Sequence, residues 1–354
     1  MTPDSTSHLW VKDIKDNDQV RGEYLVKSKR MGSTKKGDPF LSLTLADRSG
    51  EIEARVWERA NSLASLFSEG DIVDIEGAAG SYRGEVQLTL SDLKAVKEIG
   101  DPSLFIEATK QDVTKMMLSL REVLRKIDNP QIKSLLDRFL NDSAFVQLFK
   151  RAPAAKNFHH STLGGLLEHT LSVCRLALLV AEHYPELNRD LLLAGAFLHD
   201  IGKVRELGAA TSIDYTDEGR LVGHLSLGVS MVDEKLASMK DFPGEISLRL
   251  KHLILSHHGE YEFGSPKKPA FLEAFALHLI DDLDAKMNGL GRFIEKDRQA
   301  GRWTDFNRLF DRYFLKGGIA STDDKNEAPP PEAGRQRGLF SVKDGEKKET
   351  KDNF

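Results

Sequence analysis

The sequence predicts a multidomain protein, with an all-β barrel ahead of an all-α helical bundle. Apolar and polar residues alternate with a period of two within residues 8–98, which is typical of half-buried strands. Beyond residue 101 the apolar residues recur at three- and four-residue spacing, which indicates amphipathic helices. A final segment is rich in Asp, Glu, Lys, Pro and Gly, and we expect it to be a disordered tail. The expected divisions are residues 1–100, 101–155, 156–317 and 318–354.

The barrel is predicted from five alternating runs and one short helical pattern. The helical pattern, RANSLASLFSEGD, lies between the third and fourth runs. Five strands with one helix in that place is the element order of an OB-fold, and an SH3-like barrel is the main alternative. The runs are QVRGEYLVKSKRMG, PFLSLTLAD, EIEARVWE, DIVDIEGAAGSYRG and EVQLTLSDLKAV.

The helical part begins with two amphipathic segments in residues 101–155, which predict a helical connector. Residues 156–315 then have apolar-rich helical patterns almost throughout, and no strand-like alternation of similar length appears. The last of these patterns is the amphipathic WTDFNRLFDRYFLKGG, which stops at two glycines.

Composition limits the class of protein. The chain has 354 residues, 40% of them hydrophobic and 30% charged, as in a globular protein of about two domains. Its single cysteine, Cys174, excludes an internal disulfide, and no apolar run is long enough for a membrane span. We therefore expect a cytoplasmic protein without membrane contact. The net charge of −5 argues against global attraction to nucleic acid, so any such surface must be regional.

Metal-ligand side chains recur at or near the ends of the helical segments. Ligands from several helices that converge in a core are how helical bundles build metal sites. A carboxylate can bridge two cations, and two-metal sites hold their ions about 3.5–4 Å apart. Without a thiolate, the set suits Mn²⁺, Fe²⁺ or Co²⁺, with Zn²⁺ as an alternative. The candidates are His169, His199, Asp200, His224, His257, His258 and Asp281.

The order of these motifs resembles the HD-domain phosphohydrolase superfamily. An OB-type barrel ahead of such a domain is similar to the YhaM-type 3′-5′ exoribonucleases, and the resemblance covers roughly residues 8–315. The matching motifs are GGLLEHT at 164–170, LHDIGK at 198–203, GH at 223–224, LSHHG at 255–259 and LIDDLDAKM at 279–287.

The resemblance implies roles for individual residues. His169, His199, Asp200 and Asp281 match the superfamily's four-ligand core, although Asp282 and Asp284 remain alternatives for the last ligand. The histidines at 224, 257 and 258 match the additional ligands of two-metal members.

Other residues near these motifs have less specific roles. Lys203 follows Asp200 by three residues and can meet a phosphate oxygen, so Asp200 and Lys203 are the catalytic candidates, although Lys203 could be an ordinary helix C-terminal cation. His159 and His160 are candidates for substrate contact or for a helix cap, and His278 is expected in the core.

The barrel combines basic residues on the first strand and its loop with aromatics near strand ends. Single-stranded nucleic acid needs charge for its phosphates and ring faces for its bases. The alternative interpretation is a solvated charged face with aromatics in the core. The candidate nucleic-acid contacts are Lys27, Lys29, Arg30, Lys35, Lys36, Phe40, Trp57, Tyr82 and Arg83.

Together these features favour a metal-dependent 3′-5′ exoribonuclease that uses metal-activated water on single-stranded RNA, with single-stranded DNA as a second substrate. The alternatives are a phosphohydrolase acting on a small nucleotide, with the barrel as a partner or assembly module, and a non-catalytic nucleic-acid-binding protein. Homo-oligomerisation is expected as a common property of such domains. In the tail, Gln336, Leu339 and Phe340 loosely resemble peptides that bind sliding clamps.

Overall fold

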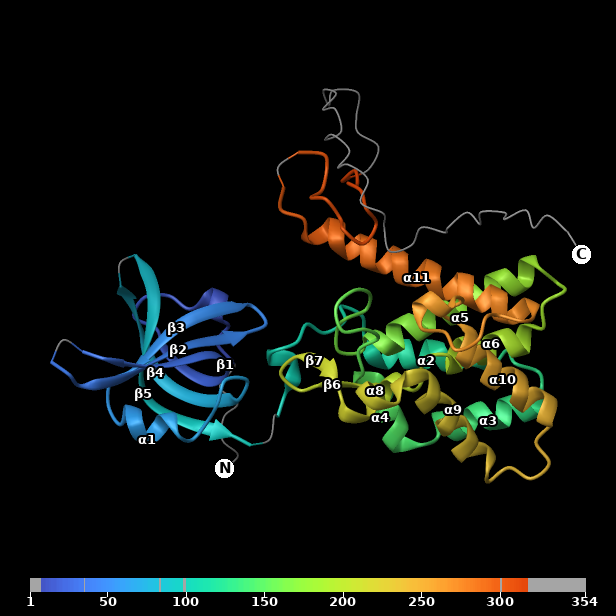
Figure 1. Ribbon diagram of the computed structural model, residues 1–354, viewed down its shortest axis with the longest axis horizontal. Helices are drawn as coiled ribbons and strands as arrows, with labels where there is room; N and C mark the ends of the chain where they lie inside the picture. Colours follow the sequence, from blue (N-terminus) through green and yellow to red (C-terminus); the bar gives the residue numbers. More distant parts are fainter. Residues whose placement is uncertain (1–7, 35, 83, 98–99, 300, 318–354) are drawn as a thin grey trace, which may run out of the picture. The chain divides into compact units, whose positions relative to one another are not determined.

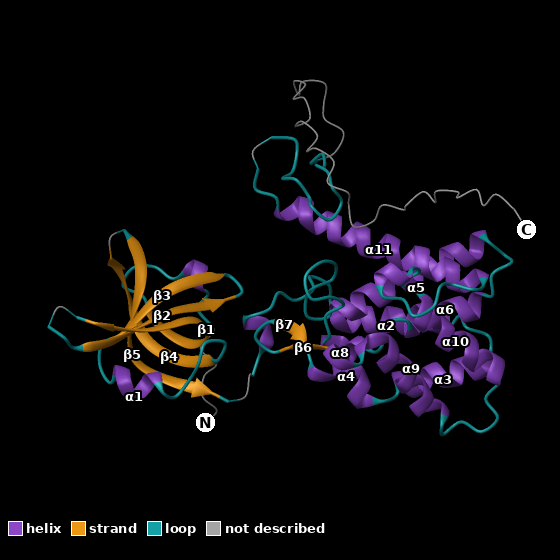
Figure 2. Cartoon of the chain, in the orientation of Figure 1, coloured by secondary structure: helices purple, strands orange, loops and turns teal. Residues whose placement is uncertain are grey.

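The computed structural model describes residues 8–34, 36–82, 84–97, 100–299 and 301–317 (Figure 1). Strands build the N-terminal part and helices most of the remainder, as the change in periodicity predicted (Figure 2). Backbone contacts divide the chain into Met1–Lys286 and Met287–Phe354. The predicted tail, with its clamp-like peptide, lies outside the described residues. Among the described residues, no helix is both long and apolar enough to cross a membrane.

Five strands close into a barrel in the order β1-β2-β3-β5-β4. Strands β3 and β5 are parallel, whereas β1 pairs antiparallel with both β2 and β4. Closure with a helix between β3 and β4 confirms the OB-fold and excludes the SH3-like alternative. The elements are η1 (Val11–Asp13), β1 (Gln19–Ser33), β2 (Pro39–Asp47), β3 (Gly50–Val56), α1 (Ala60–Ala64), β4 (Ile72–Tyr82) and β5 (Glu85–Val96).

The period-two pattern explains the barrel core. Leu41, Leu43 and Leu45 of β2 are fully buried, whereas the intervening Ser42 and Thr44 are partly exposed. Successive side chains of a strand point to opposite faces, so alternation places one apolar set inside.

Helices form the remainder, with one short hairpin and an irregular C-terminal segment. The elements are η2 (Pro102–Leu104), α2 (Val113–Leu124), α3 (Pro130–Leu140), α4 (Ser143–Arg151), α5 (Gly165–His183), α6 (Arg189–Leu198), α7 (Lys203–Glu206), β6 (Leu207–Ala209), β7 (Ile213–Tyr215), α8 (Asp217–Leu221), α9 (Gly223–Leu236), α10 (Gly244–Ser256), η3 (Tyr261–Phe263) and α11 (Leu272–Lys296).

The helices of the expected connector share one core with the helices that follow. Phe139 of α3 and Phe149 of α4 contact Phe197 of α6, with ring centroids 6.2 and 5.9 Å apart. The same cluster contains Leu120 of α2 and Leu253 of α10. The apolar faces of α2–α4 are thus buried within the helical body, where they help to fix the position of α6.

Two local predictions were wrong. The β6–β7 hairpin interrupts a region expected to be helical, because three-residue strands are too short to show a periodicity. The last amphipathic segment is also not a helix, since Trp303 and Asn307 form isolated β-bridges with Leu315 and Arg312. The Asn307 side chain accepts hydrogen bonds from two backbone N–H groups downstream, a turn preference that overrides the apolar spacing.

Candidate metal centre

The seven side chains predicted as metal ligands come together in the helical part. Short stretches around helix ends supply most of them: His199 and Asp200 follow α6, and His257 and His258 follow α10. Three further helices supply the remainder, namely His169 on α5, His224 on α9 and Asp281 on α11. Their donor atoms fall into overlapping groups whose members lie within 4.8 Å of one another.

The first group surrounds the Nε2 atoms of His169 and His199, which are 3.1 Å apart. The Oδ1 atom of Asp281 lies 3.1 Å from His169 Nε2, and the Oδ2 atom of Asp200 lies 3.3 Å from His199 Nε2. Donors that share one ion at about 2.0–2.2 Å lie about 3.0–3.5 Å apart. His169, His199 and Asp281 therefore form one candidate group of metal-ligand atoms, and Asp200 Oδ2 adjoins it beside His199.

The second group faces the other oxygen of Asp200. The Oδ1 atom of Asp200 lies 3.6 Å from His224 Nε2 and 3.5 Å from His257 Nε2. Both Asp200 Oδ1 and His224 Nε2 are buried without a hydrogen-bond partner among the described residues. An unsatisfied buried carboxylate oxygen is costly, and a cation between these atoms would satisfy both. His258 completes a group with His224 and His257.

The five candidate histidine ligands use their two ring nitrogens in the same way. Each engages a fixed acceptor through Nδ1, so that Nε2 is left for the centre. A metal-ligating histidine commonly uses its second nitrogen in this way, which fixes the ring and its tautomer. The Nδ1 partners are Asp284 for His169, the Ala196 carbonyl for His199, Glu206 for His224, the Ile254 carbonyl for His257 and the Phe263 carbonyl for His258.

The electrostatics of the first group favour a cation. Burial alone would lower the pKa of His169, but Asp200, Asp281 and Asp284 outweigh it and hold that pKa well above its usual value. Burial likewise opposes ionisation of Asp281, yet its histidine neighbours hold its pKa far below the usual range. The carboxylates thus stay ionised, and a nearby positive charge would stabilise them. In the second group, burial and adjacent histidines lower the pKa of His258 to about 3, which keeps its imidazole neutral.

The three aspartates of α11 have different surroundings. Asp281 faces the first group, as the motif comparison predicted. Asp282 forms an exposed ion pair with Lys286 at 2.7 Å. Asp284 contacts His169 from behind, at 2.8 Å from Nδ1, and also accepts from Ser172. The geometry therefore favours Asp281 as the last ligand and gives Asp284 a positioning role.

Lys203 is the first residue of α7, a single turn of four residues, so it also belongs to the last turn of that helix. Its ammonium is nearly buried and donates to Asp200 Oδ2 at 2.7 Å. Burial would lower the pKa of Lys203, but Asp200 and other acids raise it, so the side chain stays charged.

His159 and His160 lie beside the first group, and His278 lies beside the second. His160 contacts Asp284 Oδ2 at 3.2 Å and adopts a positive φ of 43°. His159 is largely buried, its Nδ1 has no partner among the described residues, and burial lowers its pKa to about 3. The Nδ1–H of His278 donates to the His257 carbonyl at 2.8 Å and so supports the chain behind the second group.

Sequence reasoning missed one carboxylate that orients this centre. Glu206 ends α7, and its Oε1 lies 2.9 Å from both Nδ1 and the backbone nitrogen of His224. No spacing rule singles it out, because residues that support a ligand have no fixed place along the chain.

We expect Glu206→Ala to weaken metal binding about 10- to 100-fold, the usual effect of losing a carboxylate behind a ligating histidine. Glu182→Ala, at an exposed position of α5, is the matched control. Metal titration of both variants measures the effect, and equal affinities would show that Glu206 does not orient a ligand.

The barrel candidates differ in accessibility. The side chains of Lys27, Arg30 and Lys36 are exposed, and Lys35 and Arg83 lie outside the described residues. Lys29 is instead engaged within the barrel, because its ammonium donates to the carbonyls of Ala64 and Phe67 at the end of α1. We therefore leave Lys29 out of the proposed phosphate contacts.

The barrel aromatics are not simply core residues. Trp57 is 48% exposed and Tyr82 is 55% exposed. Phe40 is half-buried and contacts Trp57, with ring centroids 5.0 Å apart. Trp57 and Tyr82 are therefore exposed aromatic side chains of the barrel.

Comparison with known proteins agrees with both parts of the chain. The HD domain family matches residues 166–286, and the OB-fold nucleic acid binding domain family matches residues 19–96. The 3′-5′ exoribonuclease YhaM of Bacillus subtilis is 40% identical over 304 residues, which cover 84% of this chain and 95% of that protein. The protein of the same name from Geobacillus sp. is 40% identical over 303 residues and is covered to 92%. The chain therefore belongs to the YhaM family of 3′-5′ exoribonucleases, with an OB-fold and an HD domain.

Proposed function

We propose that the protein is a metal-dependent 3′-5′ exoribonuclease that hydrolyses phosphodiester bonds of single-stranded RNA. The observation that carries the proposal is the paired donor set on the two oxygens of Asp200, with Asp200 Oδ1 and His224 Nε2 buried and unpartnered. Kinship to proteins named as 3′-5′ exoribonucleases supplies the substrate and the polarity. The cytoplasmic location and the homo-oligomer stay predictions.

The donor chemistry fits two divalent transition-metal ions, with Mn²⁺, Fe²⁺ or Co²⁺ favoured and Zn²⁺ as an alternative. When bound, such ions polarise the phosphoryl oxygen and bring the pKa of water toward neutrality. His169, His199 and Asp281 would hold one ion, and His224, His257 and His258 the other. Asp200 would contribute one oxygen to each.

The remaining side chains of the centre act on the phosphate. Lys203 keeps its ammonium charged beside Asp200, where it can also meet a phosphate oxygen as a point charge. The ring of His159 lies 5.6 Å from that of His169 and stays neutral, and its Nδ1 is buried without a hydrogen-bond partner among the described residues, so His159 stays a candidate for substrate contact. In this proposal both side chains position the scissile phosphate.

In this proposal the barrel captures the strand. Charged groups neutralise phosphates and release counterions, so that binding weakens as salt rises. Trp57 and Tyr82 offer ring faces to unstacked bases. Single-stranded DNA has the same phosphate groups and bases that can stack, and we expect it to be a second substrate.

The salt dependence of RNA binding tests the barrel. Replacing Lys27, Arg30 and Lys36 with Ala should reduce the slope of log affinity against log salt by about 2, at about 0.7 per lost phosphate contact. Lys12→Ala with Lys15→Ala, two exposed positions near η1, is the control and should leave the slope unchanged. An unchanged slope in the triple variant would remove these residues from strand capture.

The activity itself is tested with single-stranded RNA labelled at its 5′ end. Incubation with Mn²⁺ should give a ladder of stepwise shorter products, and a blocked 3′ end should suppress it. Hydrolysis of a mononucleotide that long RNA fails to inhibit, without any ladder, would instead support the small-nucleotide phosphohydrolase.

A further inference from the structure

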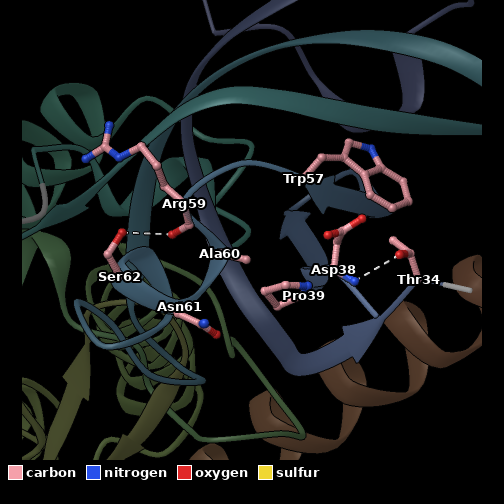
Figure 3. Close-up of a pocket in the computed structure, with 8 residues that line it drawn as sticks. All are labelled: Thr34, Asp38, Pro39, Trp57, Arg59, Ala60, Asn61 and Ser62. Carbon is pink, nitrogen blue, oxygen red and sulfur yellow. Dashed lines mark hydrogen bonds between the residues drawn. The ribbon is translucent and has the colours of Figure 1, made fainter. Parts of the chain in front are cut away.

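The barrel contains a pocket that is separate from the candidate metal centre. Its cavity volume is about 630 Å³, and residues of the β1–β2 loop, the end of β3 and the start of α1 line it (Figure 3). Pockets that take small organic ligands measure about 300–1,000 Å³. The cavity is therefore large enough for one nucleobase with its sugar.

The aromatic wall of this pocket is Trp57. Phe40 packs against it and lies across the backbone of Gly32 so closely that a Cβ at Gly32 would come within 2.4 Å of the Phe40 ring. Arg55 in turn lies over the Phe40 ring, 5.2 Å from its centroid. These contacts brace the Trp57 indole, which nevertheless remains 48% exposed and available for stacking.

The acidic group of the pocket is Asp38, whose backbone is tied to Thr34. The Thr34 N–H donates to the Asp38 carbonyl at 2.8 Å, and the Asp38 N–H donates to Thr34 Oγ1 at 3.1 Å. Pro39 further restricts Asp38 to an extended backbone. Figure 3 shows the Asp38 carboxylate directed toward Trp57. The loop thus presents a carboxylate on a tied backbone beside a braced aromatic ring.

A carboxylate on an RNA-binding surface repels phosphates and does not help general strand capture. It can, however, accept hydrogen bonds from a base edge. The Watson–Crick edge of guanine presents two adjacent N–H donors, which match the two oxygens of a carboxylate. Uracil presents one N–H between two carbonyl oxygens, and adenine and cytosine each place an acceptor nitrogen beside the amino group. The pairing therefore selects guanine.

We propose that this pocket binds a guanine base of single-stranded RNA, stacked on Trp57 with its N1–H and N2–H donated to Asp38. The inference rests on the proposed function, because it takes RNA as the ligand of the barrel. The Arg59 side chain, which lines the same pocket, points away from Asp38 and Trp57 and can meet a phosphate of the strand (Figure 3).

The test compares three single-stranded RNAs of about 12 nucleotides, within the site size of OB-folds. One contains uridine only, one has a single guanosine and one has inosine there, which lacks the 2-amino donor. The full chain is used with a chelator, so that the strands stay intact, and affinity is read by fluorescence anisotropy. The guanosine strand should bind about tenfold tighter than the uridine strand, the usual worth of a bidentate base contact, and inosine should lose most of this gain.

Two variants assign the preference to this pocket. Asp38→Asn should reduce the guanosine-to-uridine affinity ratio to about one, since it replaces one acceptor with a donor. Glu51→Gln, at an exposed position of β3, removes the same charge and should keep the ratio. Equal affinity of the wild type for both strands, or an unchanged ratio in Asp38→Asn, would overturn the assignment. The proposed function fails separately, if the same preparation does not shorten RNA once Mn²⁺ replaces the chelator.

Discussion

Asp200→Asn is expected to lower the rate of RNA shortening by at least about a thousandfold. Asp200 is the residue whose two oxygens face both donor groups, at 3.3 Å from His199 Nε2 and 3.6 Å from His224 Nε2. An amide keeps one oxygen and loses the charge, so at most one group would retain an oxygen donor and both would lose the negative charge. Metal ions contribute several kcal/mol of transition-state stabilisation, and each 1.36 kcal/mol is a factor of ten in rate.

The control for this variant concerns folding, because Asp200 also pairs with the nearly buried Lys203. Removing one partner of a buried pair destabilises by about 3–5 kcal/mol. Thermal unfolding and RNA binding in chelator should therefore be measured together with the rate. A folded Asp200→Asn variant that binds RNA and still shortens it at the wild-type rate would contradict the assigned role.

Asp281→Asn and Asp282→Asn should differ by about a hundredfold or more in the rate of shortening, although they are neighbours. Asp281 Oδ1 lies 3.1 Å from His169 Nε2, whereas Asp282 pairs with Lys286 on the surface. Loss of a metal ligand costs transition-state stabilisation, whereas an exposed ion pair contributes about 0–1 kcal/mol to stability alone. Initial rates at saturating Mn²⁺ compare the two variants.

The Asp281 prediction also discriminates between the acids of α11. Asp284→Asn should fall between the two, since Asp284 orients His169 through Nδ1 and need not touch a metal. A larger loss in Asp282→Asn than in Asp281→Asn would show that the last ligand has been assigned to the wrong residue.

The sequence could predict the barrel because its strand pattern is local. Alternation placed Leu41, Leu43 and Leu45 inside the barrel, and side chains at period two can be assigned to a face without knowledge of the fold. His199 and Asp200 could be named as candidate ligands because the order of the histidine and aspartate motifs resembles that of the HD-domain superfamily.

The features that the sequence could not predict depend on contacts between distant residues. Glu206 supports His224 across 18 positions of the chain, and Asp284 supports His169 across 115. Lys29 looked like a phosphate contact until its ammonium was placed on the carbonyls at the end of α1. None of these pairings has a periodicity, so each required the fold.

The Asp38 pocket shows the same limit within the barrel. Trp57 was recognisable as an aromatic near a strand end, but the sequence does not indicate that Asp38 lies beside it. Their convergence on one cavity follows from the pairing of β2 with β3, in which Leu41 lies opposite Val56. From the sequence alone, an acidic residue in a basic loop would be expected only to weaken the binding of RNA phosphates.

If Asp200 joins two metal sites, the stoichiometry of bound metal will show it most directly. Purified protein is loaded with Mn²⁺, freed of unbound metal and subjected to elemental analysis, alongside a His224→Ala variant. We predict two ions per wild-type chain and one per chain in the variant, because only the group that contains His224 loses a ligand. One ion per chain in both proteins would contradict the paired centre.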